Sequence, residues 1–199
     1  MAAVVPITLK RTVRPGRRAR GREHLTPVEV ARLLRAARAN RYGSRDHALL
    51  LTTWSHGLRI SEALQLLWQD FDLKAGVFHV RRKKGSISGD HPLRGVEIRA
   101  LRQVQRDGPT SAEYVFCSER GGQLTVRGVE KMVERLAVRA GLGRLNIHPH
   151  MFRHACGYYL ADRGADLRII QQYLGHRNIQ HTIRYTQISP RKFLRLWDD

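Results

Sequence analysis

The sequence is poor in acidic residues, in cysteine and in long apolar runs. Only 17 Asp and Glu stand against 36 Lys and Arg, which gives a formal net charge of +19 over 199 residues. The two cysteines, Cys117 and Cys156, fit neither a disulfide framework nor a zinc site, and they suit a reducing compartment. No apolar run approaches the ~18 residues that a membrane helix needs. We therefore expect a soluble cytoplasmic protein.

The excess of positive charge indicates a polyanionic partner. Each phosphate that a basic side chain neutralises releases counterions and so adds affinity. Apolar residues make up 42% of the chain, which is enough for a packed core. Nucleic acid is the expected partner, although a ribosome-associated protein would be equally basic, so charge alone does not name the function.

The basic residues are densest near the N-terminus. Seven of the thirteen residues from Lys10 to Arg22 are basic and none is acidic. Proline and glycine interrupt this run, which favours a mobile arm over residues 1–24. We interpret it as an arm that tracks the DNA backbone through Arg14, Arg17 and Arg18; the alternative is a solubilising tail.

The hydrophobic pattern predicts an α+β fold that is mainly helical. Thr26 and Glu29 form a capping box around Pro27, which begins a helix that runs to about Ala39. Val77 to Val80 has the pattern of a short strand, and the glycines of RRKKGSISGDHPL after it favour a hairpin. We therefore expect one small antiparallel sheet among the helices. Further helices are expected at Arg45–Trp54, Ser61–Leu67, Gly95–Gln105, Thr125–Ala140, Pro149–Arg163, Leu167–Tyr173 and Pro190–Trp197.

Phosphoryl transfer on DNA needs a nucleophile, cations for the non-bridging oxygens and a proton donor for the leaving oxygen. Arginine suits the second task because its planar fork binds two oxygens and keeps its charge. In HGLRISEAL, Arg59 lies between a glycine and a helix start, with Glu62 placed to fix the turn. Taken alone, this stretch is explained more simply by a surface arginine beside a capped helix.

The stretch HPHMFRHACG places three basic side chains on one helical face. His150, Arg153 and His154 lie at positions i, i+3 and i+4, and such a cluster is costly unless an anion lies before it. A metal site is the alternative for the two histidines. It is disfavoured because Met151 stands where a zinc protease helix has its glutamate, and because Arg153 would put a fixed positive charge beside the ion.

The stretch LGHRNIQHTIRYT carries a tyrosine with several basic residues close to it in the sequence. Tyr185 follows His176 by nine residues, with Arg177, His181 and Arg184 nearby. A tyrosine hydroxyl has a pKa near ~10, so it is a poor nucleophile unless its proton has an acceptor. Neighbouring Arg and His could stabilise the phenolate and a phosphate together.

Four motifs, taken in their order along the chain, resemble those of the tyrosine recombinase (phage integrase) family: GLRISE, His-x-x-Arg-His, Leu-Gly-His and a tyrosine. The resemblance covers Leu25 to Trp197, with twenty-three residues from Arg153 to His176. The segments RRKKGSISGDHPLRG and IQQYLGHRNIQHTIRYT look like those of the Fim-type fimbrial-switch inversion recombinases, which also have about 200 residues. We therefore expect one catalytic domain over residues 25–199, without a separate N-terminal core-binding domain.

The resemblance implies a metal-free and ATP-free strand transfer with no cofactor. Tyr185 would attack the scissile phosphate and form a 3′-phosphotyrosyl link. Arg59 and Arg153 would bind the non-bridging oxygens, and His176 would donate a hydrogen bond to the same phosphate. His150 would act in proton transfer with the tyrosine.

The family also has a lysine on the hairpin, which acts as general acid eight residues before a proline. Counting back from Pro92 gives Lys84, and its neighbour Lys83 is the alternative. Strand side chains alternate between faces, so only one of the two can point at the phosphate. Supporting or DNA-backbone roles are expected for Glu62, His154 and Arg177.

Recombination implies double-stranded DNA with two sites and four protomers, from a free protein that is a monomer or weak dimer. Accessory DNA-bending proteins and association with the nucleoid are further expectations. The apolar residues of the tail either dock on a neighbouring protomer or complete this protomer's core: Phe193, Leu194, Leu196 and Trp197. Inversion, integration and excision all stay open. The rival functions are a DNA-binding regulator without catalysis and a type IB topoisomerase.

Overall fold

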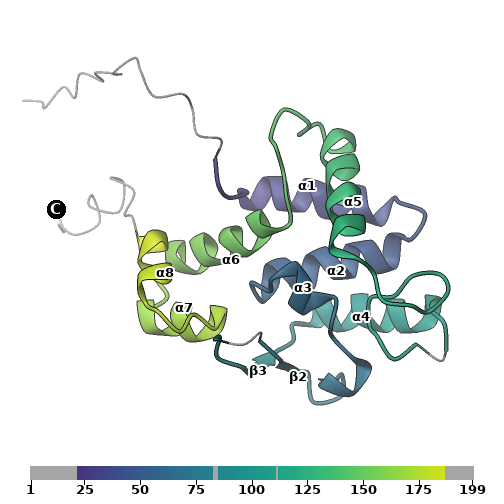
Figure 1. Cartoon of the computed structure of the whole chain (residues 1–199), viewed down its shortest axis with the longest axis horizontal. Coiled ribbons are helices and arrows are strands. Elements are labelled where there is room, and N and C mark those ends of the chain that lie inside the picture. The colour runs from purple at the N-terminus through teal and green to yellow at the C-terminus, as the bar shows by residue number, and fades with distance from the viewer. Residues whose placement is uncertain (1–21, 83–84, 111, 187–199) are drawn as a thin grey trace, which may run out of the picture.

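The computed structural model describes residues 22–82, 85–110 and 112–186. Within these ranges the chain is mainly helical and contains one three-stranded antiparallel sheet (Figure 1), which confirms the predicted fold class. The predicted helix at Pro190–Trp197 and nearly all of the basic arm lie outside the described residues.

Helix α2 (Gly43–Ser55) lies at the centre of the helical part. It packs against α1 (Pro27–Arg38), α4 (Gly95–Asp107) and α6 (His150–Asp162), and α5 (Val126–Arg139) packs on α1. The predicted capping box begins α1: the Thr26 hydroxyl accepts a bond from the Glu29 amide at 3.3 Å, and the Glu29 carboxylate accepts one from the Thr26 amide at 2.8 Å. These helices agree with the sequence prediction to within two residues at each end.

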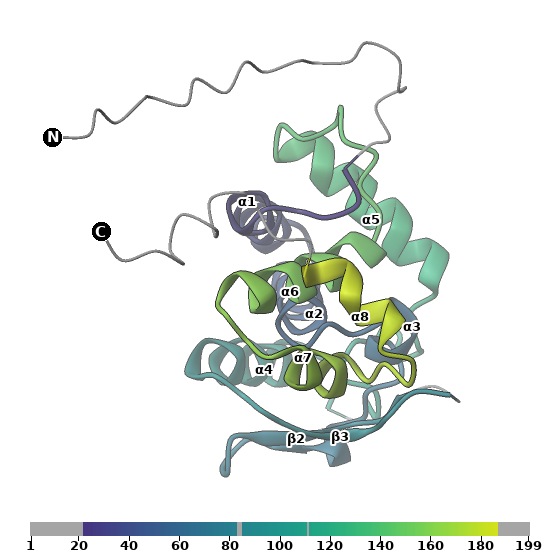
Figure 2. The same ribbon diagram turned by 90° about the vertical axis from the view of Figure 1, so that its left-hand side faces the viewer.

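The sheet contains β1 (Phe71–Asp72), β2 (Val77–Val80) and β3 (Gly89–Pro92) in that order. The hairpin of β2 and β3 pairs Phe78 with His91 and Val80 with Gly89. The sheet lies at the end of the molecule away from α1, next to α4 and α7 (Figure 2). The predicted strand and hairpin are therefore confirmed.

The third predicted helix is shorter than the sequence suggests. We expected it from Ser61 to Leu67, but α3 spans only Ile60–Ala63. Beyond it the chain pairs with a distant segment instead: the Leu66 carbonyl accepts a bond from the Val115 amide at 3.0 Å, and Leu67 forms a bridge with Tyr114. The short 3₁₀ turn η1 (Trp68–Asp70) then leads into β1. Long-range pairing thus ends a helix that local pattern would have continued.

The C-terminal part of the described chain packs back onto α6. Helix α7 (Leu167–Leu174) ends at Gly175, whose φ of +68° is the left-handed conformation that favours glycine. Helix α8 (Gln180–Ile183) and the 3₁₀ turn η2 (Arg184–Thr186) follow. They bury Tyr185 in a second apolar cluster with Cys156, Ile170 and Leu174. Both cysteines are free and buried. Among the described helices, none has the length and apolar character to cross a membrane.

Candidate active site

Four segments carry the predicted site residues, and two of them lie nine residues apart near the C-terminal end of the described chain. Arg59 begins α3, and His176 follows α7. The trio His150, Arg153 and His154 lies on α6, and Tyr185 lies in η2. Two further predicted residues are described, since Glu62 lies in α3 and Arg177 follows His176. Five others lie outside the described ranges: Lys83, Lys84, Arg14, Arg17 and Arg18.

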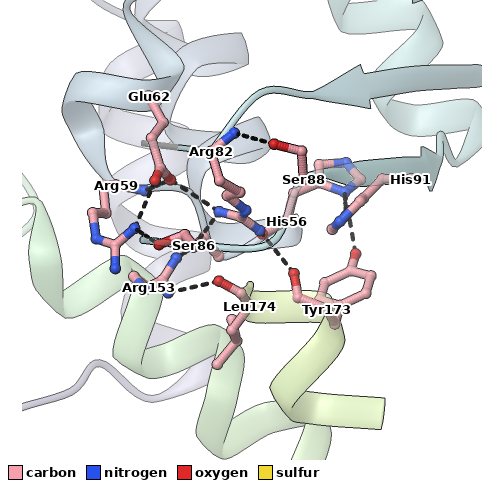
Figure 3. A network of polar contacts seen from close by, with 11 residues as sticks. His56, Arg59, Glu62, Arg82, Ser86, Ser88, His91, Arg153, Tyr173 and Leu174 are labelled. Atoms are coloured by element: carbon pink, nitrogen blue, oxygen red, sulfur yellow. Dashed lines mark hydrogen bonds and ion pairs between the residues drawn. The ribbon is translucent and has the colours of Figure 1, made fainter. Parts of the chain in front are cut away.

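Arg59 and Glu62 are bound to each other in a local turn. The Glu62 carboxylate accepts a bond from the Arg59 amide at 2.9 Å and one from Nη1 of its guanidinium at 2.7 Å (Figure 3). Nη1 also donates to the Ser86 hydroxyl at 2.9 Å. Burial alone would raise the pKa of Glu62, but the bonds and charges of Arg59 and Arg82 more than offset it and hold the pKa below its ordinary value. The Arg59 side chain stays 34% exposed, so it can still meet a ligand.

Arg153 is a buried arginine that joins two turns of the chain. It is 2% exposed, and its guanidinium donates to the carbonyl of Gly57 and, at 2.7 Å, to the carbonyl of Leu174. Burial lowers the pKa of Arg153 to about 10, with Arg82 and Arg59 acting in the same direction. The group therefore remains charged at neutral pH and holds the start of the α3 turn against the end of α7.

A second buried arginine, Arg82, was missed by the sequence prediction. It follows β2 and forms an ion pair with Glu62 at 3.0 Å, and both side chains are 1% exposed. A signal for it exists: Phe78 and Val80 are buried at alternate positions of β2, and the same period carries the inward face on to residue 82. The predicted strand ends at Val80, which leaves Arg82 among the basic residues of the hairpin.

A groove of about 780 Å³ lies beside these arginines. Arg59, Ser86, His176 and Arg177 are among the residues that line it. His176 is buried, and its Nδ1 lies 2.9 Å from the Thr182 hydroxyl. Burial lowers the pKa of His176 to about 3, and Arg153 acts in the same direction, so the ring is neutral at pH 7. If the Thr182 hydroxyl donates to Nδ1, the proton of the ring is on Nε2, which can then donate to an anion.

Tyr185 is buried next to this groove and bonded to a histidine. Its side chain is 3% exposed, and its hydroxyl lies 3.0 Å from Nδ1 of His154. Its ring stacks on that of His176, with 6.3 Å between centroids and 13° between planes. Burial raises the pKa of Tyr185 to about 12 against the opposite influence of Arg153, and burial lowers the pKa of His154 to about 3. The phenol is therefore protonated and shares a hydrogen bond with a neutral imidazole.

The histidine next to the tyrosine differs from the one that the resemblance implied. We expected His150 to act with Tyr185 and His154 to support the helix, but the hydroxyl is bonded to His154. The ring of His150 lies perpendicular to that of His154, with 4.5 Å between centroids. The reason is position along α6: His150 lies at the exposed start of the helix, whereas His154 lies one turn further in, where η2 packs.

A buried polar cluster supports the turn before Arg59. Nε2 of His56 lies 2.7 Å from Glu97 of α4, and its Nδ1 lies 3.1 Å from the Tyr173 hydroxyl, which donates to the Ser55 carbonyl at 2.8 Å. Figure 3 shows His56, His91 and Tyr173 together on the right, next to Arg82. Burial opposes ionisation of Glu97, but the bonds from His56 and Arg94 lower its pKa to about 2. This cluster fixes the end of α2, from which the Arg59 turn begins.

The charges of the site are unbalanced in favour of an anion. Three guanidinium groups, those of Arg59, Arg82 and Arg153, surround the one carboxylate of Glu62 in the described part of the site. Excess positive charge in a desolvated setting attracts phosphate more strongly than it would in water. Over the described ranges, no group of three or more His, Cys, Asp or Glu could hold a metal ion.

Comparison with known proteins identifies the family. The chain matches the model of the phage integrase family over residues 23–192. It is 42% identical to the type 1 fimbriae regulatory protein FimE of Escherichia coli (strain K12) over 182 residues, which cover 89% of this chain and 91% of FimE. It is 40% identical to FimB of the same strain over 181 residues, which cover 89% of this chain and 90% of FimB.

Solved structures agree with this result. The XerA recombinase superimposes with a TM-score of 0.74 at 27% identity, over 87% of this chain and 63% of that one. The XerH site-specific recombinase, bound to its difH substrate after cleavage, gives 0.75 at 26% identity, over 88% of this chain and 52% of that one. This chain thus spans between half and two thirds of these longer chains. The expectation of a tyrosine-type site-specific recombinase similar to the Fim-type proteins is confirmed. The chain belongs to the phage integrase family.

Proposed function

We propose that this protein cuts and rejoins double-stranded DNA at specific sites with Tyr185 as the nucleophile, and that its natural outcome is the inversion of a DNA segment. One observation carries the proposal. A tyrosine hydroxyl bonded to a neutral histidine lies next to a groove that Arg59 and His176 line and that Arg153 supports from beneath. Such a set supplies a nucleophile, a proton acceptor and a cationic phosphate site together.

The reaction conserves the energy of the phosphodiester. The Tyr185 oxygen bonds to phosphorus as the bond from phosphorus to the 5′ oxygen breaks, which leaves a 3′-phosphotyrosyl link and a 5′ hydroxyl. Attack by a 5′ hydroxyl on the link reverses the step and rejoins the strand, so neither ATP nor metal is consumed. Arg59, Arg153 and His176 stabilise the negative charge that gathers on the non-bridging oxygens. The loss of one such preorganised donor typically costs ~10²–10³ in rate.

Two proton transfers accompany the step. The phenol proton passes to His154, to which the hydroxyl is already bonded at 3.0 Å, and His150 beside it relays the proton to solvent. The leaving 5′ oxygen takes its proton from Lys84, with Lys83 as the alternative donor. Since burial raises the pKa of Tyr185 to about 12 in the free protein, deprotonation must coincide with the arrival of the phosphate.

The assembly follows from the need to exchange strands. Four protomers on two DNA sites cut with two tyrosines at a time, and the free protein is a monomer or weak dimer. Residues 25–199 provide catalysis, and the arm adds phosphate contacts through Arg14, Arg17, Arg18 and, near the groove, Arg177. Likeness to FimE and FimB favours inversion over integration. The protein works in the cytoplasm on the nucleoid, with DNA-bending partners.

A covalent trap tests the nucleophile without knowledge of the DNA site. Purified protein is incubated with nicked genomic fragments, denatured, and the attached DNA is sequenced; the recovered site is then built into a suicide duplex. The wild type should form an adduct and Tyr185→Phe should form none. Tyr158→Phe is the matched control, because its ring contacts that of Tyr185 edge to face at 5.2 Å and should leave the adduct intact. An adduct that survives Tyr185→Phe would overturn the assignment.

A supercoiled plasmid that carries two of the recovered sites in inverted orientation tests the outcome. Inversion of the segment between the sites is the expected product. Relaxation without exchange would indicate a topoisomerase, and binding without an adduct would indicate a regulator.

A further inference from the structure

The guanidinium of Arg82 contacts three separate parts of the site at once. Nη1 donates to Glu62 at 3.0 Å and to the Gly57 carbonyl at 3.3 Å. Nη2 donates to the His56 carbonyl at 3.1 Å and to the Tyr173 carbonyl at 2.7 Å. The side chain is 1% exposed, so these bonds are made out of contact with water, where they are stronger.

Each of these acceptors adjoins a residue that the proposed reaction uses. His56 and Gly57 form the turn that leads into Arg59, and the Gly57 carbonyl also accepts a bond from Arg153. Tyr173 precedes the Leu174 carbonyl, which is the other acceptor of Arg153. Arg82 and Arg153 therefore both join the turn before Arg59 to the end of α7 (Figure 3). His176 follows directly after this helix and its Gly175 cap.

Glu62 is shared between a buried cation and an exposed one. Its Oε1 accepts from Arg59, and its Oε2 accepts from Arg82. Oε2 also accepts the bond from the Arg59 amide at 2.9 Å. With Arg82 in place, part of the negative charge of the carboxylate is therefore neutralised on the side away from the Arg59 guanidinium. Without Arg82, the full negative charge of Glu62 would be available to Arg59 and would compete with a phosphate for its guanidinium.

The backbone beside Arg82 leaves room for it. A Cβ on Gly175 would lie 3.1 Å from both Cγ and Nε of Arg82 and 2.6 Å from the Ile87 carbonyl oxygen. The Ile87 amide donates to the Gly175 carbonyl at 3.2 Å, and the Arg82 amide donates to the Ser88 hydroxyl at 3.0 Å. The hairpin and the Leu-Gly-His turn are thus in direct contact around the arginine.

We propose that Arg82 is a positioning residue for catalysis, which sets the spacing between Arg59, Arg153 and His176 around the scissile phosphate. It does not touch the DNA and acts through the carbonyls and the carboxylate that it binds. Lysine cannot replace it, because an ammonium is a point charge without the planar fork that reaches four acceptors. The inference rests on the proposed function, since it assigns Arg82 to the same site.

The test compares Arg82→Lys and Arg82→Met on two suicide duplexes. One carries the normal scissile phosphodiester, and the other carries a neutral methylphosphonate at the same position. If Arg82 positions the cations of the site, its substitution should slow cleavage most on the duplex whose scissile phosphate is charged. We expect each variant to lose ~10²-fold or more in single-turnover cleavage of the phosphodiester at saturating DNA, comparable to the loss of one preorganised donor. On the methylphosphonate, the loss of cleavage rate in each variant should be at least ~10-fold smaller than on the phosphodiester, by the same reasoning. The Kd of each variant for the duplex should equal that of the wild type.

Arg45→Met is the control for a merely structural effect. Arg45 also binds a buried carboxylate, that of Asp46 at 2.7 Å, and a main-chain carbonyl, that of Cys117 at 3.1 Å, but it lies at the start of α2 away from the groove. This variant should lower the melting temperature and leave the ratio of the two cleavage rates at the wild-type value.

The outcomes separate the inference from the proposed function. Wild-type cleavage by Arg82→Lys, or an equal loss on both duplexes, would overturn the positioning role. Failure of the wild type to form a Tyr185 adduct would instead overturn the proposed function. If Arg82→Met does not fold at the assay temperature, as judged by its melting curve, Arg82→Lys decides the question, because it keeps the positive charge next to Glu62.

Discussion

At the scale of single residues, Tyr185 lies against a glycine of α6. A Cβ built on Gly157 would be 2.6 Å from Cζ of the tyrosine ring and 2.7 and 2.8 Å from two further ring carbons. Such distances are shorter than any real contact of this kind, so a side chain here would displace the ring. The absence of a side chain at Gly157 therefore allows the hydroxyl to reach His154.

The substitution Gly157→Ala has two opposite effects on the unfolding free energy, one from helix propensity and one from packing against the tyrosine ring. Alanine favours a helix by about 1 kcal/mol over glycine, but overpacking of the buried ring costs about 1–3 kcal/mol. We expect a net loss of unfolding free energy and slower formation of the covalent adduct. Denaturant unfolding measures the first and the suicide duplex the second. Gly95→Ala at the start of α4, where only the flexible end of Arg99 is near, is the control and should not destabilise the protein.

Four buried histidines, His56 among them, make stability sensitive to mild acid, because burial lowers the pKa of each. Burial lowers the pKa of His91, His154 and His176 to about 3, from an ordinary value near 6.5. Between these values the unfolded chain binds a proton at each histidine that the folded chain does not, so stability falls as the pH falls from 6.5 towards 3. The slope is up to about 1.4 kcal/mol per pH unit for each histidine.

Urea unfolding at several pH values from 7.5 to 5 checks this expectation. His154→Gln should make the dependence on pH shallower, because the unfolded chain then binds one proton fewer than before relative to the folded chain. His79→Gln is the control, since His79 is exposed on the sheet and pairs with Asp90 there. A slope that His154→Gln leaves unchanged would contradict the assignment of a buried neutral imidazole.

At the scale of elements, α4 is joined to α2 by a buried pair of polar side chains. Glu97 accepts bonds from His56 and, at 2.7 Å, from Arg94, and its side chain is fully buried. We expect Glu97→Ala to cost about 3 kcal/mol of unfolding free energy, because it leaves a buried histidine without its partner. Glu130→Ala on the exposed face of α5 should stay within about 0.5 kcal/mol. Thermal unfolding of both variants measures the difference.

Elements whose signals are local were predictable from the sequence. The capping box of Thr26 and Glu29 and the apolar period of the helices placed α1, α2, α4, α5 and α6 to within two residues. The end of α3 was not predictable, because Leu66 and Leu67 leave the helix to pair with residues near Val115. The residues around Leu66 give no indication, by themselves, that this segment pairs with a segment almost fifty residues further along the chain.

The site was predictable in its members and less so in its contacts. Order and spacing of the motifs identified Arg59, Arg153, His176 and Tyr185, which the structure brings together. The choice between His150 and His154 as the neighbour of the tyrosine depends on where η2 packs along α6, and both histidines share one helical face. Arg82 was overlooked because a buried arginine violates the expected apolar pattern of a strand, although the alternation that reveals it is plain.

At the scale of the whole molecule, the net charge of +19 predicts that the affinity for DNA falls steeply as the salt concentration rises. If the basic run of the arm binds phosphates, deletion of residues 1–22 should make the plot of log Kd against log salt concentration shallower, by roughly 0.9 for each phosphate that the arm neutralises. Fluorescence anisotropy with a duplex of the recovered site measures the slope. An unchanged slope would make the arm a solubilising tail.

The burial of Tyr185 has a consequence for the chemistry of the idle enzyme. Reagents that nitrate or iodinate tyrosine attack the phenolate, and a buried tyrosine with a pKa of about 12 offers them almost none. Treatment of the free protein should modify half-buried tyrosines such as Tyr159 first, as peptide mass spectrometry would show, and leave cleavage intact. Burial therefore shields the proposed nucleophile from such damage while the protein is free of DNA.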